Sequence, residues 1–332
     1  MKGDQNLAKE RHLVVVGAGT MGVDIAAAFL SSGWHVSLVE PVIEKHQEAK
    51  KRFIRSLSML RPVQDGQSPN FVASLQEVQF KQGQHSLVIE AVPEVLALKQ
   101  SVFAELVAVT PEDVPLCSNS SAIPISAIGR GLSAGHRMVG THFFMPAHLV
   151  PGVEVVSSQV TDPAMAERVA DDLRSAGRVP IRVKRDIPGF LVNRLQHALS
   201  REAFHLIDEG IATPADIDAA VRFGFGFRYL AAGPCLQRDH AGLDIHYAAG
   251  CSIYPDLHNG TEPGQSLKAE VDAGHYGMKV GRGFYEWNQQ SIQAERQRYE
   301  DLLLAAARLL KAEIAHAQES ASGVREDKIR IG

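Results

Sequence analysis

The sequence predicts an α/β protein in which a doubly wound, mostly parallel sheet is followed by an all-α C-terminal domain. In the first half, short apolar runs alternate with stretches of helical periodicity, which is typical of parallel strands joined by crossover helices. After the turn at residues 186–189 the strand patterns stop and helical patterns continue. We therefore expect two domains, residues 1–186 and 187–332.

Strands are expected where a short apolar run is bounded by turn residues. The expected strands are 13–16, 35–39, 86–90, 115–118, 138–141, 153–157 and 179–183. The expected helices are 20–31, 41–61, one ending near 109, one opening at 161–163, 190–209, one opening at the 213–216 capping box, and 292–319. The glycine-punctuated run 224–228 is expected to be a loop. Leucines 191, 195 and 199 lie near helical spacing, which predicts a buried stripe on the 190–209 helix.

The first expected strand runs directly into a G-x-G-x-x-G turn made by Gly17, Gly19 and Gly22. Such glycines allow a sharp turn, a close approach of a pyrophosphate and tight helix packing. Thr20 and Met21 open the next helix, whose N–H groups favour phosphates. These features indicate a Rossmann-type dinucleotide site. The alternative is a plain tight turn.

Glu40 ends the second expected strand, 18 residues after the last glycine of the turn. A carboxylate at that place accepts hydrogen bonds from ribose hydroxyls and repels a 2′-phosphate, so NAD is favoured over NADP. A solvated surface acid is the other interpretation.

Composition excludes several other classes. Hydrophobic residues make up 45%, charged residues 22%, and the net charge is −4, so no nucleic-acid partner is indicated. Three scattered cysteines match neither a disulfide framework nor a metal site. No apolar stretch is long enough for a membrane span, and the polar residues 1–5 do not begin a signal peptide. We expect a cytoplasmic location.

Polar residues with catalytic potential follow two of the expected strands. Ser121 closes a Ser-Asn-Ser-Ser run after one of them, and His142 ends the next. Ligands of an open α/β sheet bind at the carboxyl ends of its strands. A histidine there can take the hydroxyl proton while a hydride leaves an alcohol. The serines are equally well explained as a helix cap, and the histidine as a packed residue.

Two further polar residues interrupt apolar segments. Glu154 lies in the apolar strand 153–157, where an unpaired carboxylate is costly, and His142 is its expected partner. Asn193 lies one turn into an apolar helix, where an amide is unfavourable unless it has a task such as holding a substrate oxygen. The alternatives are a solvent-facing edge glutamate and an asparagine that caps a loop.

Together these motifs resemble the L-3-hydroxyacyl-CoA dehydrogenase family over nearly the whole chain, from the glycine turn to the segment 278–285. As in that family, a serine precedes the histidine by 21 residues and a glutamate follows it by 12. The family's D-x-P-G-F-x-x-N-R motif stands at residues 186–194.

The resemblance implies an NAD cofactor, a small-molecule substrate and a helical domain that forms a homodimer. It implies that His142 is the general acid/base, oriented by Glu154, and that Ser121 and Asn193 hold the substrate oxygen. The family's positions that contact NAD correspond to Glu94, Lys99, Ser121 and Lys279. Ser56 falls on a position that contacts CoA.

The chain departs from the family pattern at two places. Met145 replaces an asparagine that helps to seat the cofactor or substrate, and a thioether cannot donate a hydrogen bond. The segment 226–234 is more similar to relatives that oxidise free hydroxy acids, such as L-gulonate 3-dehydrogenase and carnitine dehydrogenase. Arg228 in that segment is either a clamp for a substrate carboxylate or a surface residue.

Three hypotheses follow. The leading one is NAD-dependent oxidation of an L-3-hydroxyacyl-CoA, favoured by the basic face of the 45–61 helix, which is otherwise a solvated surface. The second is the same reaction on a free 3-hydroxy acid, favoured by Arg228. The third is a non-enzymatic NAD-binding protein, for which related lens crystallins give precedent.

Overall fold

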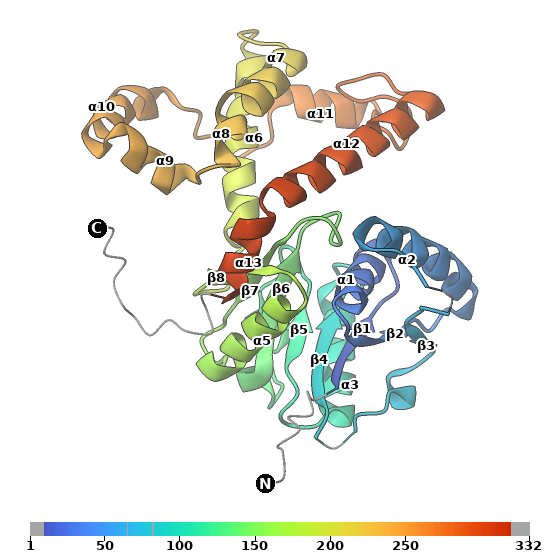
Figure 1. Cartoon of the computed structure of the whole chain (residues 1–332). Helices are drawn as coiled ribbons and strands as arrows, with labels where there is room; N and C mark the ends of the chain where they lie inside the picture. Colours follow the sequence, from blue (N-terminus) through green and yellow to red (C-terminus); the bar gives the residue numbers. More distant parts are fainter. Residues whose placement is uncertain (1–9, 65, 82, 320–332) are drawn as a thin grey trace. The chain divides into compact units, whose positions relative to one another are not determined.

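The computed structural model describes residues 10–64, 66–81 and 83–319, and these form two compact units (Figure 1). The first unit holds the described residues up to Leu191 and those from Leu303 onward, and the second is Val192–Leu302. The polar segment 1–5 lies outside the described residues. Across the described part of the chain, no helix combines the length and apolar character needed to cross a bilayer.

The first unit is built on one eight-stranded sheet of order β3-β2-β1-β4-β5-β6-β7-β8. Its strands are β1 (Arg11–Val16), β2 (His35–Val39), β3 (Asn70–Val72), β4 (His85–Glu90), β5 (Leu116–Ser118), β6 (Met138–Phe143), β7 (Gly152–Val156) and β8 (Val179–Val183). Neighbouring strands are parallel except β6 and β7, which are antiparallel. The predicted doubly wound, mostly parallel sheet is confirmed.

Both faces of the sheet are covered. Alternate residues of β1 point to opposite faces, as the pleat requires. Leu13 and Val15 join a core cluster with residues of the helices α1 (Thr20–Ser31), α2 (His46–Leu60) and α5 (Pro163–Ser175). Val14 and Val16 join a second cluster with residues of α3 (Leu96–Val109) and α4 (Ile125–Ile128). The carboxyl ends of the parallel strands β1, β4, β5 and β6 therefore lie at one edge of a sandwich with helices on both sides.

The helices of this unit largely follow the sequence prediction. They are α1 (Thr20–Ser31), α2 (His46–Leu60), α3 (Leu96–Val109), α4 (Ile125–Ile128), α5 (Pro163–Ser175) and α13 (Lys311–Glu319), and α13 lies beside β8. Asp162 caps α5 by accepting a hydrogen bond from the Ala164 N–H group. The expected helix at 41–61 is shorter, because a 3₁₀ turn occupies residues 43–45. Strand β3 was not predicted, because only three residues form it.

The second unit is helical, as predicted. Its helices are α6 (Val192–Asp208), α7 (Pro214–Ala219), α8 (Gly226–Tyr229), α9 (Pro234–Ala241), α10 (Leu243–Ile253) and α11 (Gln265–Asp272), and α12 (Gln289–Leu309) crosses its boundary at residue 302. The predicted capping box at Thr213 and Asp216 is present.

Three expectations for this unit are wrong. Residues 224–228 are not a loop: the π-helical element η4 (Ala220–Phe225) is kinked at Gly224 and continues into α8. Helix α6 begins at Val192 and not at 190, because Gly189 and Phe190 have φ of +75° and +47°. The leucine stripe of α6 is not buried, since Leu195 is 65% exposed and Leu199 is 40% exposed.

Candidate active site

The glycine turn after β1 has the shape that a dinucleotide requires. Gly17 has φ of +105°, and a Cβ there would lie 2.9 Å from the Ala91 carbonyl oxygen. A Cβ on Gly22 would lie 1.9 Å from the Gly17 carbonyl oxygen, so the helix packs against the turn only without one. A Cβ on Gly19 would meet no atom within 4 Å, so the space in front of its backbone is open. A helix N-terminus beside such an open space is a favourable site for an anion, because its backbone N–H groups point toward the anion.

A cavity of about 710 Å³ adjoins this turn. Its lining includes Gly19, Thr20 and Met21 on one side and the apolar Val42, Leu75 and Val92 on the other. Glu40, at the carboxyl end of β2, also lines it. The Glu40 carboxylate accepts N–H groups of Ala18 at 3.3 Å and Val42 at 3.1 Å, which aims it at this cavity. The apolar part of the cavity fits adenosine, and the Glu40 carboxylate fits the ribose hydroxyls. The N-terminus of α1 fits the pyrophosphate.

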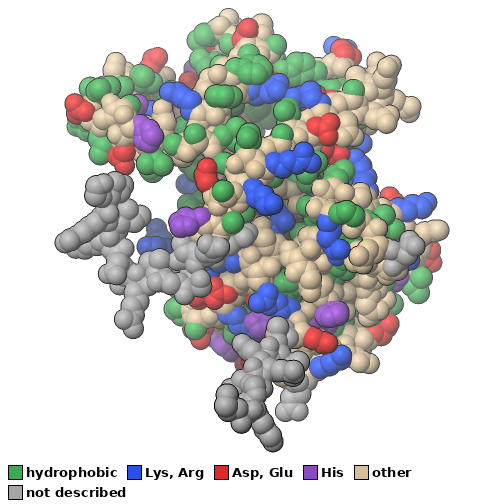
Figure 2. Space-filling model, viewed as in Figure 1, with side chains coloured by type: hydrophobic (Ala, Val, Ile, Leu, Met, Phe, Trp, Pro, Cys, Tyr) green, Lys and Arg blue, Asp and Glu red, His purple; other side chains and the backbone are tan. Residues whose placement is uncertain are grey.

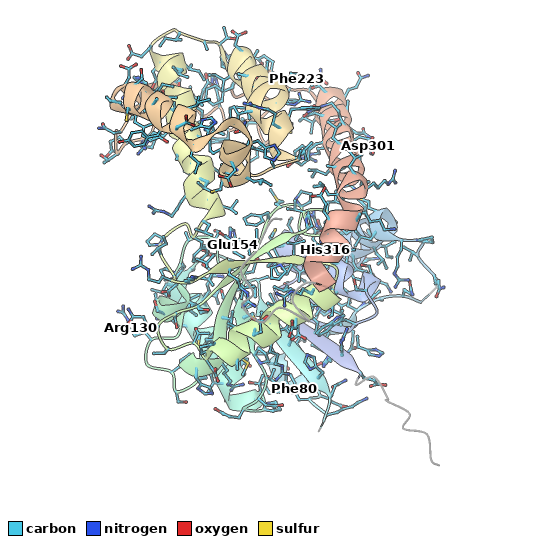
Figure 3. All side chains as sticks on the ribbon, turned by 60° about the vertical axis from the view of Figure 1, so that its left-hand side comes forward. Phe80, Arg130, Glu154, Phe223, Asp301 and His316 are labelled. Carbon is cyan, nitrogen blue, oxygen red and sulfur yellow. The ribbon has the colours of Figure 1, made fainter. Side chains whose placement is uncertain are left out.

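His142 and Glu154 face each other across the antiparallel pair β6 and β7, at one register position. The imidazole Nδ1 lies 2.7 Å from Glu154 Oε2, and both side chains are buried. Figure 3 shows Glu154 among the strands of the sheet. The pairing that the sequence predicted is therefore present in the structure.

The surroundings of this pair hold it rigidly. Phe144 meets the imidazole edge-on at a centroid distance of 4.7 Å, and Phe190 lies at 5.7 Å. Phe190 is buried although its backbone is in the left-handed region, which is rare for a bulky residue. The turn around it aims the Leu191 N–H group at Glu154 Oε1, 2.8 Å away. Each oxygen of the carboxylate thus has its own donor.

This arrangement selects one tautomer of the histidine. An ionised carboxylate only accepts hydrogen bonds, so Nδ1 carries the proton and donates it to Glu154. Nε2 then has a lone pair that can take a proton from an alcohol. The imidazolium formed would be stabilised by the buried carboxylate, as in a catalytic triad.

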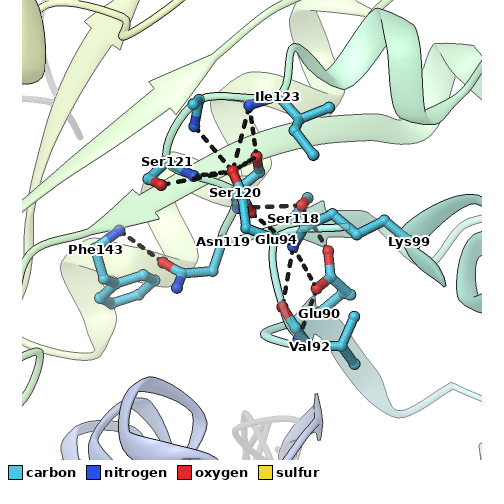
Figure 4. Close-up of polar contacts among 11 residues, drawn as sticks. Glu90, Val92, Glu94, Lys99, Ser118, Asn119, Ser120, Ser121, Ile123 and Phe143 are labelled. Atoms are coloured by element: carbon cyan, nitrogen blue, oxygen red, sulfur yellow. Dashed lines mark hydrogen bonds and ion pairs between the residues drawn. The ribbon is translucent and has the colours of Figure 1, made fainter. Parts of the chain in front are cut away.

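Ser121 lies in the loop after β5, which is the strand next to β6. One oxygen of Glu94, Oε1, accepts the N–H groups of Ser121 at 3.0 Å, Ala122 at 3.0 Å and Ile123 at 3.3 Å (Figure 4). Burial favours the neutral acid, but hydrogen bonds from Ser120 and Ala122 and the charge of Lys99 hold the pKa of Glu94 below its ordinary value. Glu94 is therefore an ionised anchor for the serine loop.

Lys99, a position that the resemblance assigns to NAD contact, is buried among acceptors of the protein itself. Its side chain is 1% exposed, and its ammonium is enclosed by Glu90 Oε1 at 2.8 Å, the Val92 carbonyl oxygen at 3.2 Å and Glu94 Oε2 at 3.3 Å. An ammonium has three N–H groups, and these three acceptors use them. Within the fold, Lys99 is an internal counterion of Glu90 and Glu94.

Ser56 is also buried, and its hydroxyl donates to Asp24 Oδ1 at 2.8 Å. The fully buried Asp24 also accepts from Arg52, and His148 lies 3.2 Å from it as an ion pair. Burial alone would raise the pKa of Asp24, but His148 and Arg52 hold it below its usual range. Ser56, which the resemblance assigns to CoA contact, is thus part of a buried polar cluster around Asp24.

Of the remaining predicted site residues, one lies in the first unit and three lie in the helical unit. Met145 follows β6 and is 68% exposed. Asn193 is the second residue of α6, Arg228 lies on α8, and Lys279 lies in the glycine-rich turn 277–283 of the helical unit.

Several polar residues of the site were missed from the sequence. Glu90 ends an apolar strand and Asp24 lies between Val23 and Ile25, so both carried the signal that identified Glu154, an acid in an apolar segment. Asn119 Oδ1 accepts the Phe143 N–H group at 2.9 Å, and no pattern in the sequence indicates that contact.

Comparison with known proteins agrees with this geometry. Residues 12–187 match the family model of the 3-hydroxyacyl-CoA dehydrogenase NAD binding domain, and residues 189–287 match that of the C-terminal domain. The chain belongs to the 3-hydroxyacyl-CoA dehydrogenase family. It is thus an NAD-dependent oxidoreductase that acts on CH–OH groups.

Two curated relatives differ in their substrates. The 5-formyl-3-hydroxy-2-methylpyridine 4-carboxylate 5-dehydrogenase of Mesorhizobium japonicum is 31% identical over 91% of this chain and 98% of its own length. The 3-hydroxybutyryl-CoA dehydrogenase of Mycobacterium tuberculosis is 34% identical over 82% of this chain and 97% of its own. A crystal structure of a 5-formyl-3-hydroxy-2-methylpyridine 4-carboxylic acid 5-dehydrogenase, described as an NAD+-dependent dismutase, is similar to this chain, with a TM-score of 0.84 and 29% sequence identity. The match covers 91% of this chain and 99% of that chain.

The substitution Glu40→Ala tests the cofactor end of the site. Removing the carboxylate removes its repulsion of a 2′-phosphate, so the ratio of kcat/KM with NAD to that with NADP is expected to fall by about tenfold or more. Glu44→Ala, which removes a nearby exposed acid, is the matched control. An unchanged ratio in Glu40→Ala would show that this carboxylate does not select the cofactor.

The substitutions His142→Ala and Glu154→Gln test the paired side chains. His142→Ala is expected to lower kcat by roughly two to four orders of magnitude, because the proton acceptor is lost, while the Kd for NADH stays within about twofold. Glu154→Gln is expected to lower kcat with the fold intact, because an amide no longer stabilises the imidazolium. His136→Ala, an exposed histidine of the same unit, is the control. Wild-type turnover in either variant would exclude that residue from the reaction.

Proposed function

We propose that this chain transfers a hydride reversibly between NAD and a substrate whose secondary alcohol lies β to a carboxyl group. The observation that carries the proposal is the buried His142–Glu154 pair at the end of β6, on the sheet edge where the dinucleotide cavity opens. In the oxidising direction, Nε2 of neutral His142 accepts the hydroxyl proton. Glu154 stabilises the resulting imidazolium, and Ser121 holds the substrate oxygen. NAD, when bound, supplies the hydride acceptor.

The buried state of Ser56 favours a free hydroxy acid over a CoA thioester as the substrate. A CoA atom could accept from the Ser56 hydroxyl only if the hydrogen bond of that hydroxyl to the fully buried Asp24 broke, and Ser56 is only 3% exposed to a CoA group that would donate to it. Losing a hydrogen bond to a buried charge is costly, roughly 1.5–3 kcal/mol. The Mesorhizobium japonicum relative, whose name gives a pyridine carboxylate and no CoA thioester, supports a substrate without CoA.

A CoA thioester remains the second candidate, and one observation favours it. A groove of about 540 Å³ beside the glycine turn is lined by the basic residues Lys45, Lys51, Arg52 and Arg55. Such a groove suits the phosphates of CoA. The acids Glu40 and Glu48 line it too, which weakens the positive field.

A paired substrate panel distinguishes the two classes. The purified protein is assayed with NAD on L-3-hydroxybutyrate, L-gulonate and L-carnitine, and with NADH on acetoacetyl-CoA. We expect kcat/KM for at least one free acid to exceed that for acetoacetyl-CoA by about tenfold or more. Activity on acetoacetyl-CoA alone would assign the CoA class. Tight NADH binding with no turnover on either panel would favour the non-enzymatic hypothesis.

Arg228→Met extends this test to the carboxylate clamp. A bidentate arginine–carboxylate contact contributes through two charged hydrogen bonds, so its loss is expected to raise KM about tenfold for the free acid while kcat changes little. Arg222→Met, which changes a nearby exposed arginine in the same unit, is the control. Equal KM values in both variants would assign Arg228 to the surface.

We also propose that the helical unit forms a homodimer. None of residues 192–302 is buried, and large apolar side chains are widely exposed, among them Phe223 at 73% and Tyr247 at 76% (Figures 2 and 3). A folded unit must bury apolar surface to offset the entropy lost on ordering its chain. A second copy would supply the missing cover.

Light scattering tests the dimer. The wild-type protein is expected to have twice the mass of one chain, and the double variant Phe223→Asp/Phe227→Asp is expected to be monomeric, because two charges would be placed in an apolar interface. Ile43→Asp, at an exposed apolar residue of the other unit, should remain dimeric. A monomeric wild-type protein at every concentration tested would contradict the proposal.

A further inference from the structure

A buried polar network joins the ends of three neighbouring strands, and Glu90 lies at its centre (Figure 4). Glu90 is the last residue of β4 and is fully buried. Its Oε1 accepts from Lys99 Nζ at 2.8 Å and from the Val92 N–H group at 2.7 Å. Its Oε2 accepts from the Ser118 hydroxyl at 2.6 Å, at the end of β5.

One arm of this network leads to the serine loop. The Ser118 oxygen accepts the Ser120 N–H group at 3.2 Å, and the Ser120 hydroxyl donates to Glu94 at 2.6 Å. Glu94 is the residue that collects the N–H groups of the loop, including that of Ser121. Lys99 closes the ring, because its ammonium lies between the carboxylates of Glu90 and Glu94.

The other arm leads to the strand that carries His142. The Asn119 N–H group donates to the Glu90 carbonyl oxygen at 2.8 Å. The Asn119 side-chain oxygen accepts the Phe143 N–H group at 2.9 Å, directly after His142 in the chain. The end of β4 is thereby connected to the ends of β5 and β6 through groups with defined hydrogen-bond geometry.

Burial of such a network costs more desolvation free energy than burial of apolar side chains. A buried carboxylate–ammonium pair must overcome a large desolvation cost, and a well-packed apolar pair of similar volume is often as stable. A polar network with all members satisfied does, however, hold its parts in one arrangement. The value of this network is therefore geometric, since displacement of a reacting group by about 1 Å can cost about 10²-fold in rate.

We propose that Glu90 is a positioning residue that sets Ser121 relative to His142, with Lys99 and Ser118 as the groups through which it acts. Glu90 itself touches neither substrate nor cofactor. The inference rests on the proposed function in that it takes Ser121 and His142 as the groups that meet the substrate.

Three variants test the proposal in the full-length protein. Glu90→Gln removes the charge and keeps the shape. Ser118→Ala removes the two hydrogen bonds of the Ser118 hydroxyl, one donated to Glu90 and one accepted from the Ser120 N–H group, without introducing any charge. Asp172→Asn is the matched control, because Asp172 is a buried acid paired with His85 at the opposite end of the same strand. Turnover per folded molecule, KM, NADH affinity and melting temperature are measured for each.

Glu90→Gln and Ser118→Ala are expected to lower kcat/KM for the free hydroxy acid by about 10- to 100-fold, because Ser121 is displaced relative to His142. Because both act through one network, the double variant should lose less than the product of the two single losses. Asp172→Asn should lower the melting temperature but leave kcat/KM within about twofold. Amide hydrogen exchange of Ser121 and Ala122 should accelerate in the first two variants only, a readout that needs no substrate.

Unchanged kcat/KM and unchanged exchange at Ser121 in Ser118→Ala would overturn the proposal, even if Glu90→Gln fails to fold. A loss of activity in Asp172→Asn equal to that in Ser118→Ala would also overturn it, because the effect would then follow stability alone. Failure of the proposed function is distinguishable from either result. In that case His142→Ala retains full activity, whereas failure of the positioning role leaves His142→Ala inactive and Ser118→Ala active.

Discussion

The antiparallel pairing of β7 with β6 is the constraint on which the site depends. In the parallel part of the sheet, successive strands are joined by crossovers, so residues at opposite positions lie far apart in sequence. Reversal at β7 brings Glu154 back to the register position of His142 after only twelve residues. The pleat then sends both side chains to one face. A buried imidazole and a buried carboxylate can coexist there because each satisfies the other.

The first unit could be predicted well because its signals are local. The apolar runs, the glycine turn and the proline at the start of α5 each act over a few residues, and the structure contains the elements they indicate. Strand β3 could not be predicted, because its three residues form no apolar run. It lies at the edge of the sheet and pairs with β2. Residues 224–228 were expected to be a loop because of their glycines, but only Gly224 leaves the helical backbone, and Gly226 begins α8.

The candidate site was predictable only in part, for a physical reason. An acid in an apolar strand signals that a partner exists, and for Glu154 that partner could be named from a neighbouring motif. The same signal at Asp24 and Glu90 has partners on other elements, and their identity depends on how those elements pack. Lys99 illustrates the limit. The family resemblance implies a contact of Lys99 with NAD, which stays a prediction, whereas its two carboxylate partners could be found only from the packing.

The left-handed turn at Phe190 has a consequence for the buried carboxylate beside His142. The N–H group of Leu191 supports one oxygen of the buried carboxylate, and the next residue is the first of α6 and of the helical unit. A shift in the backbone at this junction would withdraw that donor and make the negative charge more costly to keep. The turn that ends the first unit is therefore also part of the support of the buried Glu154 carboxylate.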